Sequence, residues 1–278
     1  MKHLSIIART CYTLCIGCLG VQQFIYKDFR PVILPEWPHW IHQSPWFAFI
    51  VGAALLVAAI LISFEKMGGR IEIMLGIGML ILFLAFHAPN QIFIIPYKFH
   101  LGLWTDALKE LALAGGAFIL AAGSSTRQWD EKRNGFRLTQ DQLMQLGKIF
   151  FSTTMISFGI DHFLYTESIS NLVPAWISDH IFWTRFAGIA LIGSGTAIVL
   201  NIFVRQVAIL LSLMLLLWVI LLHIPRAIAD PHVASGNEIT SAFEALAFSG
   251  ISLTIAIMSV SKVQSKLPEL TQTKVQAK

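Results

Sequence analysis

Long apolar runs separated by short polar connections dominate this chain. Eight runs approach the roughly 20 residues that an α-helix needs to cross a bilayer, and charged side chains are scarce inside them. The runs are Leu4–Tyr26, Trp46–Phe64, Ile71–His87, Trp104–Gly123, Leu143–Tyr165, Phe182–Phe203, Val207–His223 and Ser241–Val260. The pattern predicts an all-α integral membrane protein with eight transmembrane helices.

The two halves of the chain share a similar pattern of apolar and polar residues. Residues 20–37 read GVQQFIYKDFRPVILPEW, and residues 159–176 read GIDHFLYTESISNLVPAW. Downstream, LAFHAP is matched by LLHIP, and ELALAGG is matched by EALAFSG. An internal repeat of this kind predicts two similar structural units. Each unit holds four predicted helices, an even number, so both would insert in the same orientation.

The repeat divides the chain into four segments. Residues 1–123 form the first four-helix unit, and residues 143–261 form the second. Residues 124–142 are polar and charged, and we interpret them as a cytoplasmic linker. Residues 262–278 form a polar tail that we expect to be loosely ordered.

The composition agrees with a membrane protein. The chain is 55% hydrophobic and 13% charged, whereas a soluble domain is about 25% charged. With both termini in the cytoplasm, only six of the 20 basic residues lie outside: Lys27, Arg30, Lys98, Lys109, Arg185 and Arg226. The positive-inside rule therefore favours this topology. The net charge of +4 reflects that bias, and nothing resembles a nucleic-acid-binding module. The first run lacks a small-residue cleavage site, so we expect it to stay in the protein.

The two longest outer loops, Lys27–Pro45 and Thr166–Ile181, contain proline and tryptophan. Tryptophan is enriched where helices leave the membrane, so Trp37 and Trp176 fit an aromatic belt. A Pro-x-Trp sequence recurs in both loops, which also fits a segment that covers a cavity between the helices. Both interpretations stay open from the sequence.

Ionisable residues gather near the predicted outer ends of the helices. The second half holds Asp161, His162, Arg185, His223 and Glu244 there. Such groups are costly in a membrane and usually face a bundle interior or a wet cavity. We therefore take His162, His223 and Glu244 as candidate catalytic residues, and Asp161, Arg185 and Trp176 as candidate substrate-binding residues.

The first half holds a reduced version of this set. His87 and Glu110 match His223 and Glu244, and we add them and Trp37 to the candidate binding residues. Gln22-Gln23 stands where the second half has Asp161-His162, so the second half is the one we expect to be active.

Plainer explanations exist for several of these residues. His87 and His223 could simply end their helices, because a proline follows each of them two residues later. Glu110 and Glu244 could pair with Lys109, Arg185 or Arg226 in a purely structural role.

Other chemistry has weaker support in the sequence. Cys11, Cys15 and Cys18 share one face of the first helix, where small residues favour close helix contacts. A redox role would instead need a thiolate in a polar setting. The sequence contains no phosphate-binding glycine loop and no zinc-protease motif. A haem or metal site built from His87, His162 and His223 is a further alternative.

The repeated unit resembles the DoxX-like superfamily, which includes DoxD and MauE-type membrane proteins. The resemblance is best over residues 158–250, and it rests on Gly159, His162, Phe163, Pro174, Trp176, His223 and Glu244. It implies a tandem pair of DoxX-like units in a bacterial or archaeal inner membrane. It also implies an association with quinone, thiol or sulfur redox chemistry.

The function that follows is a redox-associated membrane protein with a polar pocket open to the outer face. The sequence does not define a cofactor, and a quinone or a small polar substrate are the candidate ligands. A soluble or membrane redox subunit is the candidate partner besides the lipid bilayer. If the chain is an enzyme, it is a membrane oxidoreductase subunit. A small-molecule or proton-coupled transporter and a non-catalytic assembly or cargo partner are the alternatives.

Overall fold

The computed structural model describes residues 2–65, 69–97, 99–124 and 138–276, with side chains through residue 259. Every regular element in these residues is a helix. Seven helical segments have the length and the hydropathy to cross a membrane. They are α1 (Lys2–Tyr26), α3 (Pro45–Ser63), Arg70–Ile94, α6 (Gln140–Leu164), α8 (His180–Val199), Val204–Ala229 and Val233–Ser259. The protein is therefore a multi-pass membrane protein.

The eighth predicted span is also a helix, but it differs from the others. This helix, α5 (Thr105–Ala122), carries Asp106, Lys109 and Glu110, so its composition does not by itself mark it as a span. Fifteen of its 18 residues are buried. Of its charged residues, Glu110 is among these buried ones, whereas the Asp106 side chain is 43% exposed. A short 3-10 turn, η3 (Leu101–Trp104), leads into it.

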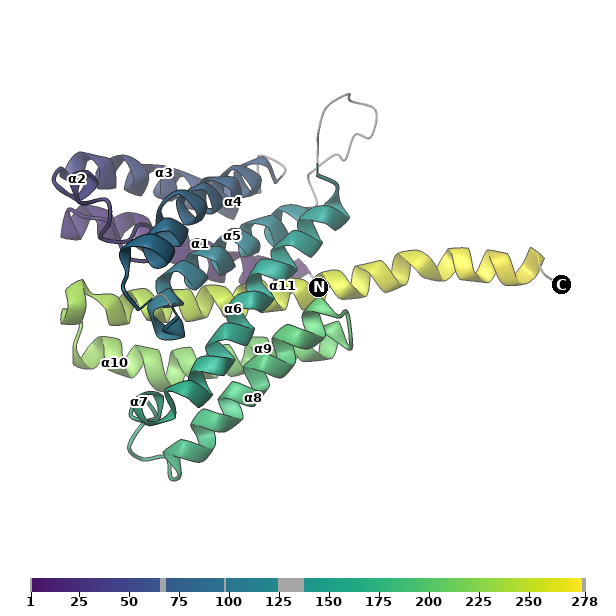
Figure 1. Ribbon diagram of the computed structural model, residues 1–278. Coiled ribbons are helices and arrows are strands. Elements are labelled where there is room, and N and C mark those ends of the chain that lie inside the picture. The colour runs from purple at the N-terminus through teal and green to yellow at the C-terminus, as the bar shows by residue number, and fades with distance from the viewer. Residues whose placement is uncertain (1, 66–68, 98, 125–137, 277–278) are drawn as a thin grey trace.

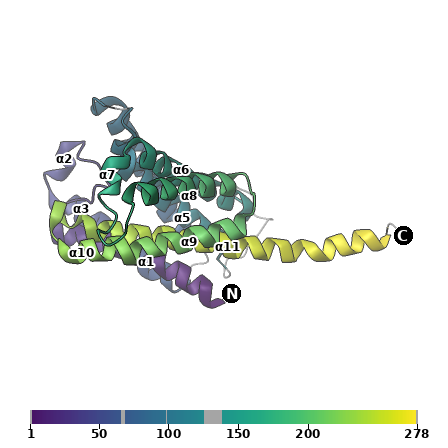
Figure 2. The ribbon, with the colours of Figure 1, turned by 90° about the horizontal axis from the view of Figure 1, so that it is seen from below.

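Two helices lie at the centre of the bundle. The long helix α11 (Asn237–Gln276) packs on α1, on α5 and on α9 (Val204–Trp218). Helix α5 packs on α6 and on α4 (Arg70–Leu82). Figure 1 shows α11 running between the group of α1, α3 and α4 and the group of α8, α9 and α10 (Ile224–Ala229), with α6 crossing in front of α11. Figure 2 shows the same helices from below.

Glycines allow pairs of helices to approach closely. A Cβ atom on Gly20 of α1 would lie 2.8 Å from the carbonyl oxygen of Gly52 on α3. A Cβ atom on Gly159 of α6 would lie 2.7 Å from the carbonyl oxygen of Gly188 on α8. These distances leave no room for a side chain, so glycine is required at both crossings.

The histidines that were predicted to end helices lie inside them. His87 ends the π-helical turn η1 (Phe83–His87), and the segment continues through Pro89 into η2 (Asn90–Ile94). His223 ends the π-helical turn η4 (Val219–His223), and α10 (Ile224–Ala229) follows it. The prediction that the prolines stop these helices was wrong. A π-helical turn widens the helix, and this relieves the clash that a proline ring makes with the preceding turn.

The two outer loops differ in how deeply they are packed. In the first-half loop, residues 27–38, the side chains of Val32, Ile33 and Leu34 are fully buried. The short helix α2 (His39–His42) follows it. The second-half loop, residues 165–179, begins with α7 (Thr166–Ser170), and its Asn171 and Leu172 are exposed. The first-half loop therefore fills the space beneath it, whereas the second-half loop does not.

Helix boundaries depart from the prediction at both ends of the second unit. Helix α6 begins at Gln140, where Thr139 and Gln142 form a reciprocal capping box. Most of the predicted linker lies outside the described residues. The backbone of α11 stays helical through Gln276 and extends beyond the bundle (Figures 1 and 2). Residues 262–276 of the predicted polar tail thus continue the backbone of α11.

Candidate functional site

A cavity of about 790 Å³ lies among the helices of the second half. We call it the second-half cavity. Its walls come from α6, α8, α9, η4, α11 and the second-half loop, and Thr105 and Lys109 of α5 complete them. Its volume falls within the range of about 300–1,000 Å³ that is typical of small-molecule sites.

Most of the cavity wall is apolar. Aromatic and aliphatic side chains of α8 and α9 form its sides, including Trp183, Phe186 and Trp218. Phe186 of α8 and Leu217 of α9 are about half exposed, and both lie at the edge of the cavity in membrane-spanning helices. The cavity is therefore accessible from the side that faces the lipid.

The structure brings together five of the nine predicted site residues. Asp161, His162, Trp176, His223 and Glu244 all line the second-half cavity. They come from α6, the second-half loop, η4 and α11, so residues far apart in the sequence meet there.

The other four predicted residues lie elsewhere. Arg185 is exposed on α8 and does not line the cavity. Thr184 and Ala187, on the opposite side of that helix, are buried cavity residues instead. Trp37 is half-buried in the first-half loop. His87 and Glu110 form a separate buried pair in the first half, with 3.4 Å between Nε2 and Oε2.

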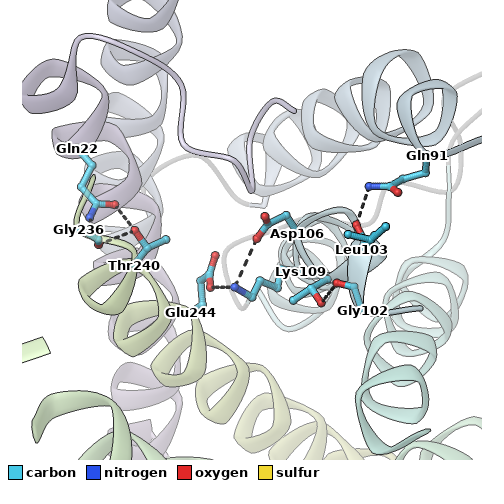
Figure 3. A network of polar contacts seen from close by, with 10 residues as sticks. Gln22, Gln91, Gly102, Leu103, Asp106, Lys109, Gly236, Thr240 and Glu244 are labelled. Atoms are coloured by element: carbon cyan, nitrogen blue, oxygen red, sulfur yellow. Dashed lines mark hydrogen bonds and ion pairs between the residues drawn. The ribbon is translucent and has the colours of Figure 1, made fainter. Parts of the chain in front are cut away.

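Lys109 is the cavity cation that the sequence did not single out. Its Nζ atom lies 2.8 Å from Oε2 of Glu244 and 3.5 Å from Oδ1 of Asp106 (Figure 3). One of the structural pairings considered from the sequence, Lys109 with Glu244, is therefore present. The sequence offered this pair only as one of several alternatives, because the pair depends on how α5 packs against α11.

Neighbouring contacts fix the start of α11, on which Glu244 lies. The hydroxyl group of Thr240, one turn before Glu244, donates a hydrogen bond to the side-chain oxygen of Gln22 at 2.8 Å. The amide nitrogen of Gln22 donates to the carbonyl oxygen of Gly236 at 3.3 Å (Figure 3). Helix α1 thus holds α11 in position beside the cavity.

Arg30 of the first-half loop also contacts the backbone just before the start of α11. Its Nη1 atom donates a hydrogen bond to the carbonyl oxygen of Ser235 at 2.8 Å, and its guanidinium group lies 4.9 Å from the centre of the Tyr26 ring. Burial lowers the pKa of Arg30 below its ordinary value because a charged guanidinium loses its hydration there.

His162 is held in one orientation. Its Nδ1 atom lies 2.7 Å from the carbonyl oxygen of Phe158. A carbonyl can only accept, so Nδ1 carries the hydrogen, and Nε2 of the neutral ring is left as an acceptor. The ring also stacks on Trp218, with 5.9 Å between the ring centres. The imidazole is therefore oriented to take a proton through Nε2.

Several polar atoms of residues that line the cavity have no hydrogen-bond partner in the described protein. They are Oδ1 of Asp161, Nδ1 of His223 and Oε1 of Glu244. Buried polar groups without a partner are costly. The cavity can therefore hold a molecule whose polar end bonds to these groups while its apolar part contacts the aromatic wall.

The described residues give no support to a metal site. No three His, Cys, Asp or Glu side chains among them are grouped closely enough to hold an ion. The alternative that joins His87 with His162 and His223 is therefore not realised. Cys11, Cys15 and Cys18 are free thiols in α1, and none of them lines the second-half cavity.

No protein family, no curated protein and no solved structure matches this chain.

Proposed function

We propose that this protein binds a quinone-type amphiphile in the second-half cavity and takes part in membrane redox chemistry. The observation that carries the proposal is a mostly apolar cavity, open toward lipid, whose lining also includes five polar residues: Lys109, Glu244, His223, His162 and Asp161. A quinone combines a flat polar ring with a long apolar tail, so it matches both parts of this lining.

Each polar residue has a role in this proposal. Lys109 has three N–H donors. Two face Asp106 and Glu244, so the third is free to bond a carbonyl oxygen of the ring. The carboxylates of Glu244 and Asp161 accept from ring hydroxyl groups in the reduced form. His162 and His223 are the groups that exchange protons with the ring.

The proposal includes a duplicated architecture. The Gly20–Gly52 and Gly159–Gly188 crossings support it, as do the π-helical turns that end at His87 and His223. Helix α11 packs on α1 as α5 packs on α6. We accordingly propose two DoxX-like four-helix units, with α5 as the eighth membrane-embedded helix.

The proposal also includes the membrane topology and the cellular location of the protein. Eight membrane-embedded helices would place both termini on the same side of the membrane, and the distribution of Lys and Arg favours the cytoplasm of a bacterial or archaeal cell. The second-half cavity would then lie toward the outer face of the inner membrane. A soluble or membrane redox subunit would exchange electrons with the bound ligand.

Binding of a short-chain ubiquinone analogue to the purified protein in nanodiscs tests the proposal. Trp176, Trp183 and Trp218 line the cavity, so the bound analogue should quench tryptophan fluorescence. We expect His223→Ala and Glu244→Gln to weaken binding several-fold. Arg185→Ala, on the exposed side of α8, is the matched control and should bind as the wild type does.

Three results would separate the alternatives. Equal affinity of His223→Ala, Glu244→Gln and the wild type would refute the site assignment. No quenching together with proton-coupled flux in proteoliposomes would identify a transporter. No ligand and no flux, with a co-purifying protein, would identify an assembly partner.

A further inference from the structure

The first half contains a buried acid–base pair that the proposed function does not use. His87 is 1% exposed and Glu110 is 0% exposed, and 3.4 Å separates His87 Nε2 from Glu110 Oε2. Both residues are enclosed by protein in the interior of a membrane-embedded bundle. An ionisable pair in that setting is costly unless its polar atoms are hydrogen-bonded.

Most polar atoms of this pair lack hydrogen-bond partners among the described residues. Both carboxylate oxygens of Glu110 are buried without one, and the His87 ring has only the backbone of Val32 as a partner, which leaves one ring nitrogen unpaired. The 3.4 Å separation is longer than the 2.7–3.2 Å of an ordinary N–H···O bond. A small molecule that donates and accepts hydrogen bonds would bind all of these atoms.

The first-half loop excludes a larger ligand from this place. The backbone of Val32 hydrogen-bonds to the His87 ring, and the side chains of Val32, Ile33 and Leu34 are fully buried. The corresponding part of the second-half loop contains Asn171 and Leu172, which are exposed.

The loop is held in this closed position by two polar anchors. His42 lies 2.7 Å from Oδ1 of Asp28 and 2.9 Å from the carbonyl oxygen of Pro35, through its two ring nitrogens. Arg30 donates to the carbonyl oxygen of Ser235. The anchors lie on both sides of the buried residues 32–34, so the loop remains over the pair.

We propose that the first half holds a second, closed polar site in which His87 and Glu110 bind water molecules, sealed by residues 32–34. Water is the ligand that fits, because it both donates and accepts hydrogen bonds and is the smallest molecule that can do both. Buried waters commonly make about three hydrogen bonds to otherwise unsatisfied groups. This site does not depend on what binds in the second-half cavity.

X-ray hydroxyl-radical footprinting of the full chain in nanodiscs tests the proposal, because radicals formed from bound water oxidise adjacent side chains even when they are buried. We expect His87 to be oxidised at a rate close to that of exposed His232. Phe118, which is 1% exposed, should react many-fold more slowly and serves as the buried control.

Two variants separate bound water from general opening of the fold. Glu110→Gln keeps hydrogen-bonding groups and should preserve the oxidation rate of His87, whereas Glu110→Leu should lower it several-fold. The rate at Phe118 should stay unchanged in both. Slow oxidation of wild-type His87, equal to that of Phe118, would overturn the proposal. The comparison of His87 with Phe118 uses the wild-type protein alone, so it tests the proposal even if Glu110→Leu fails to fold.

Discussion

Two neighbouring residues of α5 serve opposite halves of the protein. Successive helix positions differ by about 100° around the axis, so Lys109 reaches Glu244 while Glu110 reaches His87. A single helix therefore supplies a cation to the second-half cavity and a carboxylate to the closed first-half site.

The Lys109–Glu244 pair should matter for stability as well as for binding. Removing one partner of a buried ion pair typically costs about 3–5 kcal/mol because the other charge is left unpaired. We expect Lys109→Met to lower the free energy of unfolding by about that amount, and Lys109→Met with Glu244→Gln to recover part of it. Reversible unfolding in mixed micelles measures both.

A partly exposed ion pair is the natural comparison. Arg226 and Glu238 lie 2.5 Å apart, and the Arg226 side chain is 37% exposed. Pairs near the surface contribute about 0–1 kcal/mol, so Arg226→Met should have a much smaller effect. An equal loss in Lys109→Met and Arg226→Met would contradict the role assigned to the buried pair.

The sequence identified most of the polar cavity residues but not their neighbours. Asp161, His162, His223 and Glu244 stood out because ionisable groups are rare in apolar runs. Arg185 stood out for the same reason, yet it faces away from the cavity. The rotation of α8 about its axis decides this, and α8 is apolar all round, so the sequence does not define its inward side.

At the scale of helices, close glycine crossings decide which elements pack together. A Cβ atom at Gly159 would lie 2.6 Å from Ile192 Cγ1 and 2.7 Å from the Gly188 carbonyl oxygen. We expect Gly159→Ala to force α6 and α8 apart and to cost about 1–3 kcal/mol, as overpacking usually does. Thermal unfolding in detergent is the measurement.

Gly193 on α8 provides the control for this change. A Cβ atom there would have no neighbour within 4 Å. Alanine is a better helix former than glycine by about 0.5–1 kcal/mol, so Gly193→Ala should leave stability unchanged or raise it. Similar losses for both substitutions would show that the α6–α8 crossing is not the cause.

Helices were easier to predict than their interruptions. Each apolar run became a helix, because length and hydropathy carry that information. The π-helical turns at His87 and His223 were not predicted, since a proline two residues later is normally a stop signal. The burial of residues 32–34 was also missed, because an apolar loop can pack inward or lie at the membrane surface.

At the scale of the whole molecule, the proposed topology can be measured directly. In a variant with Cys11, Cys15 and Cys18 changed to Ser, we expect Ser178→Cys to react with a membrane-impermeant maleimide on intact cells. Arg205→Cys should react only after the cells are opened. Both positions are exposed. The opposite pattern of labelling would invert the topology.

A chain divided within residues 124–138 tests how far the halves depend on each other. Because Lys109 comes from the first half and Glu244 from the second, neither fragment can build the cavity alone. We expect the ligand to bind only when both fragments are produced together. Binding by the second fragment alone would show that Lys109 is dispensable.

The placement of Lys109 also has an evolutionary consequence. Two copies that arise by duplication can at first be separated again without loss, since each is complete. Once one copy depends on an ammonium group from the other, a gene that loses either copy loses the site as well. If the chain arose by the proposed duplication, the shared cavity wall would select against losing either unit. The first-half site would stay free to diverge.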